Sequence, residues 1–88
     1  MLHARRDYDA IQDPRGLIPD MEPVMLFRAQ DKHAPKTLMY YVLQLLKDEE
    51  VEYDLIEAVI LQIRSMQQWQ REVKSKTPDL PQFELKFD

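Results

Sequence analysis

Arginine and aromatic side chains gather near the start of the chain, where they could bind a phosphorylated base. Tyr8 offers a ring on which a purine can stack, and such stacking is worth about 1–3 kcal/mol per base. Three arginines lie near it in the sequence, Arg5 and Arg6 before it and Arg15 after it. A guanidinium group can bind phosphate through two parallel hydrogen bonds. Alternatively, Tyr8 only pins the N-terminal segment to the core. Residue types alone leave both interpretations open.

A second cationic cluster precedes the first long helix that the sequence predicts. The run Arg28-Ala29-Gln30-Asp31-Lys32-His33 lies just before a helix N-terminus, where free N–H groups and the helix dipole favour an anion. Lys36, in the first turn, adds charge to the Arg and Lys of this run. The competing interpretation is a solvated loop in which Asp31 caps the helix. His33 by itself is more typical of a surface or packing residue than of a ligand.

Arg64 lies at the border of the apolar face of the second predicted helix, one turn from Ile60 and one turn from Gln68. Its ordinary role is an ion pair with Glu57 on the same helix or with another surface carboxylate. It could instead reach across an oligomer interface to a phosphate that another subunit binds, because the guanidinium presents a fork of donors.

The residues that catalysis and metal binding require are scarce. The chain has no Cys, one Gly, two His and two Ser. Nucleophilic catalysis needs Ser, Cys or Thr beside an oriented base, a zinc site needs several His or Cys ligands, and a phosphate-binding loop needs several glycines. Paired carboxylates such as Glu49-Glu50 are typical of solvated caps. We therefore predict no enzymatic activity, no metal and no cofactor.

Composition and charge predict one folded domain. The 88 residues are 44% hydrophobic and 32% charged, which is the balance of a globular chain rather than a disordered one. The net charge of −4 argues against binding to nucleic-acid polymers, which needs a basic surface. Residues 1–47 hold seven Lys and Arg against six Asp and Glu, a net +1, whereas residues 48–88 hold five against ten, a net −5. An anion site should therefore draw on the first half.

The sequence contains no segment that predicts secretion or membrane insertion. Residues 1–6 lack an apolar stretch that could act as a signal. The longest apolar run, Leu38–Leu46, is interrupted by Gln44 and is too short to cross a bilayer. The absence of Cys excludes a disulfide framework and favours a reducing cytosol.

The first third of the chain should be mostly irregular. Residues 1–34 show no sustained helical period, although Asp7–Ile11 could form one helical turn. Asp13-Pro14-Arg15-Gly16 is a turn signature, because Asp bonds nearby backbone N–H groups, Pro presets φ and Gly tolerates positive φ. Val24–Phe27 is a short apolar run, either extended or a single helical turn.

Two long helices should follow. The first begins at Pro35, whose fixed φ suits the first helical turn, and continues to about Asp48, with apolar residues around almost its whole circumference. The second runs from Val51 or Tyr53 to Ser75 and is apolar on one face, which predicts an antiparallel hairpin. That stripe consists of Leu55, Ile56, Val59, Ile60, Ile63, Met66 and Val73.

The predicted fold is all-α, with a short N-terminal helical or irregular segment followed by an antiparallel hairpin of two long helices. A hairpin alone cannot cover the first helix or shelter Leu61 and Trp69, so we expect neighbouring subunits to bury them in a homo-oligomer. The single domain, 1–88, divides into an N-terminal ligand-contacting segment (1–34), the hairpin (35–76) and a C-terminal tail (77–88). In the tail, the alternation of Phe83, Leu85 and Phe87 with polar residues fits an added strand, a strap on a neighbour or a loose end.

Several motifs of the first 40 residues resemble one known family. The stretch Arg6-Asp7-Tyr8-Asp9-Ala10-Ile11-Gln12-Asp13-Pro14-Arg15-Gly16-Leu17-Ile18-Pro19 is followed by Glu22-Pro23-Val24, Leu26-Phe27-Arg28-Ala29-Gln30-Asp31 and Ala34-Pro35. Together they resemble the second type of phage anti-CBASS protein, a family of cyclic-oligonucleotide sponges. The helical remainder agrees in kind rather than residue by residue.

The resemblance implies a homohexamer of helical protomers in the cytoplasm of the host bacterium. Such a protein sequesters the second messengers of CBASS immunity without cleaving them, namely cyclic dinucleotides such as 3′,3′-cyclic GMP–AMP and cyclic trinucleotides such as cyclic tri-AMP. In the family, an N-terminal Tyr, a base-packing side chain and an Arg of a partner hold the dinucleotide between protomers. Tyr8 and Arg64 match the Tyr and the Arg, whereas Pro23, Met25 and Phe27 stand where the family can place a base-packing Lys.

The main alternative is a small helical adaptor or inhibitor that binds a host protein through the same apolar surfaces. An enzyme that hydrolyses cyclic nucleotides is disfavoured by the missing His and metal ligands. The predicted ligand-binding residues are Tyr8, Arg15, Phe27, Arg28, Gln30, Lys32, Lys36 and Arg64.

Overall fold

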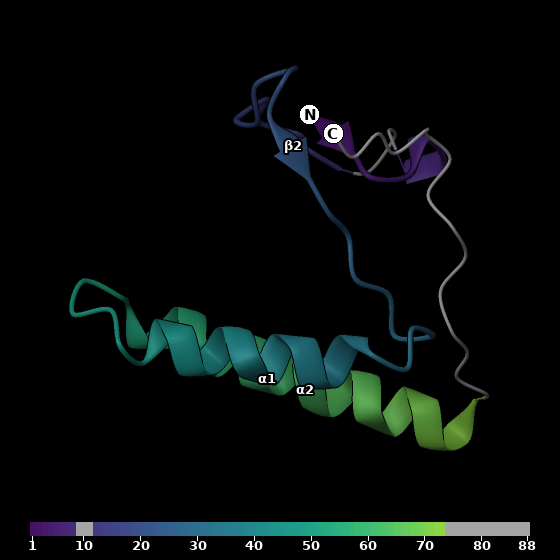
Figure 1. Cartoon of the computed structure of the whole chain (residues 1–88), viewed down its shortest axis with the longest axis vertical. Coiled ribbons are helices and arrows are strands. Elements are labelled where there is room, and N and C mark those ends of the chain that lie inside the picture. Colours follow the sequence, from purple (N-terminus) through teal and green to yellow (C-terminus); the bar gives the residue numbers. More distant parts are fainter. Residues whose placement is uncertain (9–11, 74–88) are drawn as a thin grey trace, which may run out of the picture. The chain divides into compact units, whose positions relative to one another are not determined.

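The computed structural model of the chain describes residues 1–8 and 12–73 (Figure 1). The described part divides into two compact units, residues 1–26 and residues 27–73. The single-domain organisation stays a prediction. In chain order the elements are β1 (Leu2–His3), the 3₁₀ helix η1 (Arg6–Tyr8), β2 (Pro23–Val24), α1 (Ala34–Leu45) and α2 (Tyr53–Glu72).

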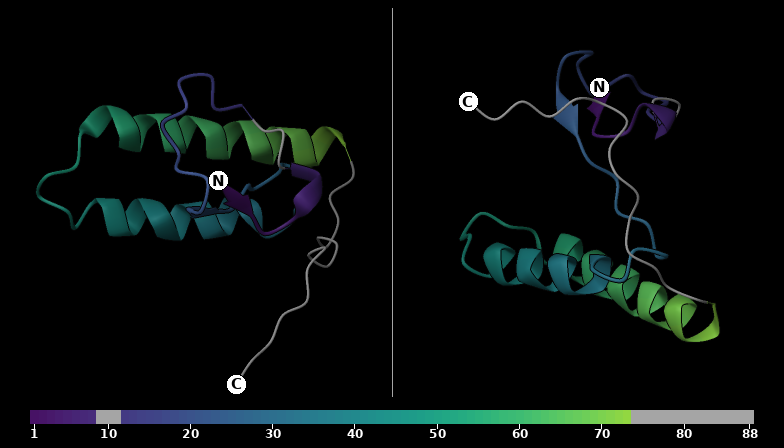
Figure 2. Two further views of the ribbon diagram at one scale, coloured as in Figure 1. Left: turned by 90° about the horizontal axis from the view of Figure 1, so that it is seen from above. Right: turned by 45° about the vertical axis from the view of Figure 1, so that its right-hand side comes forward.

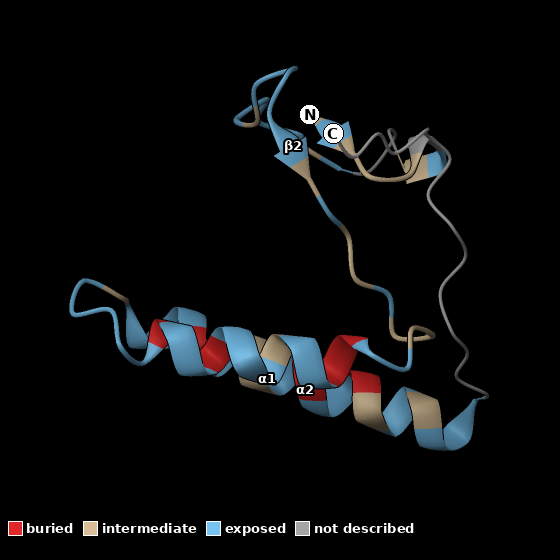
Figure 3. Ribbon diagram, viewed as in Figure 1, coloured by how far each residue is buried: buried red, intermediate tan, exposed pale blue. Residues whose placement is uncertain are grey.

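The second unit is an antiparallel hairpin of α1 and α2, which lie side by side in two views (Figures 1 and 2). The buried residues belong to α1 and α2 (Figure 3), and four of them form one cluster between the helices. The predicted hairpin is therefore confirmed. Burial of an apolar side chain contributes about 1.5–3 kcal/mol relative to exposure, so this core is what stabilises the hairpin. The cluster comprises Val42, Leu45, Ile56 and Ile63, with Leu38, Val51, Val59 and Ile60 partly buried against it.

The helix ends differ from the predicted ones by a few residues. Helix α1 begins one residue before Pro35 and ends at Leu45, before the predicted end at Asp48. After Leu45 the chain tightens into shorter turns, in which the Lys47 N–H donates to the Gln44 carbonyl at 3.1 Å and the Asp48 N–H to the Leu45 carbonyl at 3.0 Å. The Asp48 carboxylate then accepts a hydrogen bond from the Glu50 N–H at 2.9 Å, which stabilises the loop between the helices. Helix α2 begins at Tyr53 and ends at Glu72, short of the predicted end at Ser75, because Val73 is already extended, with φ −124° and ψ 155°. Residues 74 and 75 lie outside the described residues.

The first unit contains a feature that the all-α prediction missed. Strands β1 and β2 pair in parallel, with Leu2 opposite Pro23 and His3 opposite Val24. Pro23 begins its strand, as a residue without an N–H can. Two-residue strands are too short to show alternation in a sequence, which is why the N-terminal segment was expected to be helical or irregular. The protein is mostly helical but includes this small parallel pair.

A tight turn in the first unit confirms its sequence signature. The Gly16 N–H donates to the Asp13 carbonyl at 3.0 Å, and Gly16 has a positive φ of 61°. The two carboxylate oxygens of Asp13 accept hydrogen bonds from the N–H groups of Leu17 and Ile18, each at 3.1 Å. The predicted helical turn at Asp7–Ile11 is present as η1 as far as Tyr8, and its remainder lies outside the described residues.

Two further predictions concern the C-terminal tail and membrane insertion. The tail from 77 to 88, with its alternating Phe and Leu side chains, lies outside the described residues. Among the helices that the structure does describe, none combines the length and the apolar character that crossing a bilayer requires.

Candidate functional site

One face of the hairpin carries two adjoining hollows, which together we call the hairpin groove. Its first part encloses about 360 Å³ and its second about 510 Å³; the two share Met39, Leu43 and Gln67. Each part falls in the size range of small-molecule sites. The first part is completed by Val42, Ile60, Ile63 and Arg64, and the second by Lys32, Pro35, Lys36, Tyr40 and Gln70.

The floor of the hairpin groove is apolar and aromatic, and much of it is exposed. Met39, Tyr40 and Leu43 are 51%, 66% and 55% exposed, respectively. Leu43 follows Tyr40 by three residues and Met39 by four along α1, so the three side chains lie on one side of the helix. A flat apolar ligand or another protein chain could cover these side chains.

The rim of the hairpin groove is cationic. Lys32 and Lys36 line its second part and Arg64 its first, and no acidic residue is among the lining residues of either part. Within residues 1–8 and 12–73, Arg64 forms no ion pair with Glu57, the ordinary role considered for it. The groove therefore combines three positive charges with an apolar floor.

The N-terminus of α1 contributes less to anion binding than the sequence suggests. The Asp31 carboxylate accepts a hydrogen bond from the His33 N–H at 2.8 Å, and the Ala34 N–H donates to the Asp31 carbonyl at 3.0 Å. Pro35 has no N–H to offer. Because these groups are occupied or missing, and because Asp31 is itself negative, the lysine side chains are the main cationic groups available to an anion here.

Gln70 ties the residues before α1 to the far end of α2. Its side-chain nitrogen donates to the backbone carbonyls of Ala29 and Asp31, both at 2.9 Å. These hydrogen bonds cross 41 and 39 residues of sequence. They hold the turn that leads into Lys32, and so they position the cationic end of the hairpin groove.

Tyr8 lies in the first unit and is half-buried in η1. The guanidinium carbon of Arg5 lies over its ring, 4.8 Å from the ring centre, an arrangement that a cation–π interaction stabilises. Arg5 also binds Asp7 through two hydrogen bonds, of 2.6 and 3.1 Å. A base that stacks on Tyr8 must therefore use the ring face opposite Arg5 or displace Arg5.

The other predicted ligand residues of the second unit do not line the hairpin groove. Arg15 is exposed on the turn of the first unit, and Arg28 is exposed in the turn that precedes α1. Phe27 and Gln30 are half-buried in the second unit. Of the eight predicted residues, the structure thus brings three together, namely Lys32, Lys36 and Arg64.

The sequence interpretation missed the two glutamines of this face. Gln67 lines both parts of the hairpin groove and Gln70 one of them. The available signal was their spacing, because Arg64, Gln67 and Gln70 follow one another at intervals of three residues along α2 and share one side of it. Glutamine is common on exposed helix faces, so its type alone did not single out these positions.

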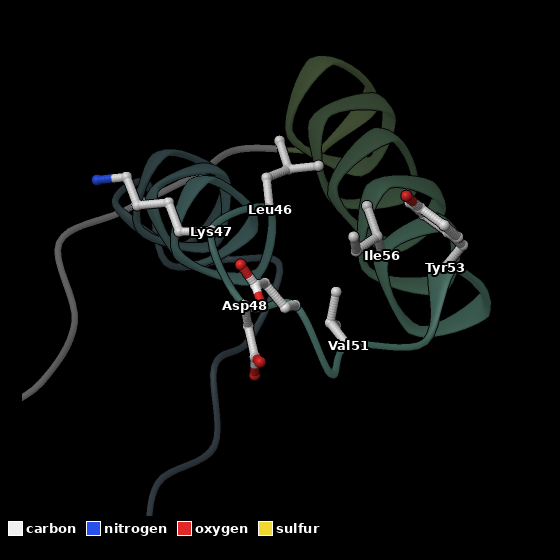
Figure 4. Close-up of a pocket in the computed structure, with 7 residues that line it drawn as sticks. Leu46, Lys47, Asp48, Val51, Tyr53 and Ile56 are labelled. Atoms are coloured by element: carbon white, nitrogen blue, oxygen red, sulfur yellow. The ribbon is translucent and has the colours of Figure 1, made fainter.

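A smaller pocket lies where the loop between the helices closes the hairpin, and we call it the closed-end pocket (Figure 4). It encloses about 290 Å³ and is lined in part by Leu46, Val51, Tyr53 and Ile56. Lys47 points away from it in Figure 4. Asp48 and Glu49 also line this pocket, so its charge suits a phosphorylated ligand less well than that of the hairpin groove.

The described residues thus define a small helical-hairpin protein with a cationic, apolar groove. Across residues 1–8 and 12–73, no group of three or more His, Cys, Asp or Glu side chains is placed to hold a metal ion. No protein-family model, curated protein or solved structure matches the chain.

Proposed function

We propose that the protein binds and sequesters cyclic oligonucleotides without cleaving them. By its sequence resemblance it is a phage-encoded sponge for cyclic di- and trinucleotide messengers of CBASS immunity, acting in the host bacterial cytoplasm. The observation that carries the proposal is the hairpin groove, in which Lys32, Lys36 and Arg64 border an apolar floor without acidic neighbours in its lining.

The chemistry of a cyclic oligonucleotide fits this groove. Its phosphates are anions, which Arg64 can bind through its fork of donors and the lysines through their point charges. Its bases are flat and largely apolar on their faces, so they can cover Met39 and Tyr40 on the groove floor. A base on an aromatic ring is worth about 1–3 kcal/mol.

The hairpin exposes large apolar side chains both within its groove and outside it, which supports a second subunit that covers them. Leu43, Leu46 and Tyr53 on the hairpin are all exposed, and exposed apolar patches of this kind mark interaction surfaces. We propose a homo-oligomer, a hexamer by the resemblance, in which a neighbouring protomer forms the opposite wall and its Tyr8 stacks on a base.

The alternative, an adaptor or inhibitor that binds a host protein, is favoured by the closed-end pocket. Tyr53 and Leu46 are exposed beside it, and neither lines the hairpin groove. A protein partner could bury both side chains without any nucleotide.

A stoichiometric titration tests the proposed function. Protein is added to a fixed amount of 3′,3′-cyclic GMP–AMP, the free ligand is measured over several hours, and the bound ligand is released by heating. A sponge should give a sharp endpoint, a free concentration that is constant in time, and intact ligand on release, because sequestration depends on the number of sites. Light scattering of the same samples measures the mass of the assembly.

Each other outcome overturns the proposal in a distinct way. Slow loss of all messenger at sub-stoichiometric protein, with linear product, shows turnover. No uptake of cyclic di- or trinucleotides rejects the sponge and favours the adaptor. A monomeric mass with full binding rejects the placement of the site between subunits but retains the ligand.

A further inference from the structure

The amide of Gln70 is held in one orientation by the chain itself. A glutamine side chain has two N–H donors and one oxygen acceptor. Both donors of Gln70 are engaged, by the carbonyl oxygens of Ala29 and Asp31 at 2.9 Å each. Rotating the amide by half a turn would set its oxygen against two carbonyl oxygens, which repel it.

The Gln70 oxygen is therefore left to accept a hydrogen bond. Gln70 lines the second part of the hairpin groove with Lys32 and Lys36. The hydrogen bonds of Gln70 in the described part of the chain use its nitrogen and not its oxygen. Among the described residues, the one buried side-chain polar atom without a hydrogen-bond partner is Nδ1 of His3. The Gln70 oxygen is therefore accessible rather than buried without a partner.

We propose that Gln70 determines base specificity in the hairpin groove, its side-chain oxygen accepting a hydrogen bond from the amine of a purine base. This inference rests on the proposed function. Adenine presents an exocyclic amine and guanine presents an amine and a ring N–H, and each can donate to a fixed oxygen. A base edge that offers only carbonyl oxygens or C–H groups leaves this acceptor unpaired or repelled. The neighbouring lysines bind the phosphates that accompany the base.

The fixed orientation is what makes Gln70 selective. A freely rotating amide can offer either its oxygen or its nitrogen and accepts both kinds of base edge. Gln67, which shares the groove, has no such pair of carbonyl partners among the described hydrogen bonds. Loss of one hydrogen bond at a half-buried acceptor should weaken binding by roughly 5- to 100-fold.

The test compares two ligands that differ by one group. Cyclic di-AMP is matched with the same cyclic dinucleotide carrying unsubstituted purine, in which hydrogen replaces the adenine amine. Wild-type protein should prefer cyclic di-AMP by roughly 5- to 100-fold. In Gln70→Met, which keeps the length of the side chain but removes its polar atoms, the preference should shrink to about twofold or less, within the factor that context allows.

Two variants separate specificity from support of the fold. Gln62→Met, at an exposed position of α2, should keep the wild-type preference. Gln70→Glu keeps an acceptor oxygen but loses both donors, so it should weaken both ligands while retaining a preference for the amine. Circular dichroism confirms that each variant is folded. A residue that only supports the turn before α1 would lower the affinity for both ligands equally.

The outcomes distinguish this inference from the proposed function. If wild type binds both ligands equally, the role of Gln70 is wrong and the sponge stands. If Gln70→Met is folded and keeps the wild-type preference, the amine is recognised elsewhere and the inference is overturned. If wild type binds neither ligand nor any cyclic trinucleotide, both proposals fail.

Discussion

Residues 27–73 are held by the packing of one helix on another, whereas residues 1–26 are held by a short strand pair, a turn and contacts between neighbouring side chains. Every residue that the structure describes as buried lies in residues 27–73, and none lies among residues 1–5, 7–8 and 12–26. In the other region the main contacts are those of Asp13 with the backbone and of Arg5 with Asp7 and Tyr8.

Under the proposed function, this difference suits the two regions to different contacts with a ligand. A packed hairpin fixes the backbone positions from which Lys36 and Arg64 extend, and a rigid scaffold lowers the entropy lost on binding. The contacts of Arg5 and Tyr8 are exposed or half-buried and are each worth about 1 kcal/mol or less. The hairpin therefore suits the anion site, and the N-terminal unit suits a contact that adjusts to the ligand.

The largest expected effect is in the hairpin core. Ile63 is 5% exposed, so Ile63→Ala should lower the free energy of unfolding by about 2–5 kcal/mol through lost burial and the cavity left behind. Urea unfolding followed by circular dichroism measures it. Gln62→Ala, at the exposed neighbouring position, is the control and should stay within about 0.5 kcal/mol. Equal losses in the two variants would contradict packing as the main stabilising force.

The next effect concerns the ligand. Arg64→Gln should weaken cyclic dinucleotide binding by roughly 10- to 150-fold, because a hydrogen bond to a charged group contributes about 1.5–3 kcal/mol. Calorimetric titration at constant salt measures the affinity. Arg71→Gln makes the same chemical change at an exposed site that does not line the hairpin groove, and it should change affinity much less. Similar losses in both would mean that net charge, not the groove, sets the affinity.

The hairpin was predictable because its signals are periodic and long. The predicted stripe repeats at helical spacing, and its members from Ile56 to Met66 are buried or partly buried, whereas Leu55 and Val73 at its two ends are exposed. Pro35 marks the start of α1 to within one residue. The strand pair was not predictable, because pairing of Leu2 with Pro23 joins residues far apart in sequence and neither segment shows a period. The turn at Asp13 was predictable, because its geometry depends on residues that are adjacent.

The candidate site was predictable in its charges but not in its walls. Lys32, Lys36 and Arg64 could be recognised by type, and their meeting on one groove follows from the hairpin. The role of Gln70 could not be recognised, because its hydrogen bonds to Ala29 and Asp31 join the two ends of the unit. The occupation of the α1 N-terminus by Asp31 was foreseen only as an alternative.

A smaller loss of affinity is expected in the N-terminal unit. Tyr8→Ala removes the ring that would stack on a base, so it should cost about 1–3 kcal/mol, or roughly 5- to 150-fold in affinity, with the mass of the assembly unchanged. The same titration measures it beside Arg64→Gln, and Tyr8→Phe, which keeps the ring, should retain most of the affinity. Unchanged binding in Tyr8→Ala would restrict the site to the hairpin. A loss much greater than that of Arg64→Gln would mean that the N-terminal unit, rather than the hairpin, contributes most of the affinity.

The smallest expected effect tests whether the two regions open separately. Gly16 has a φ of 61°, and a Cβ added there would meet no atom within 4 Å, so Gly16→Ala should cost about 1 kcal/mol through backbone strain alone. That cost should speed amide hydrogen exchange of Leu17 and Ile18 roughly fivefold, because both N–H groups are held by the Asp13 turn. Gly16→Asn should have a smaller effect, since Asn tolerates positive φ. If the amides of α2 speed up by the same factor, the two regions unfold as one cooperative unit and the contrast between them does not extend to stability.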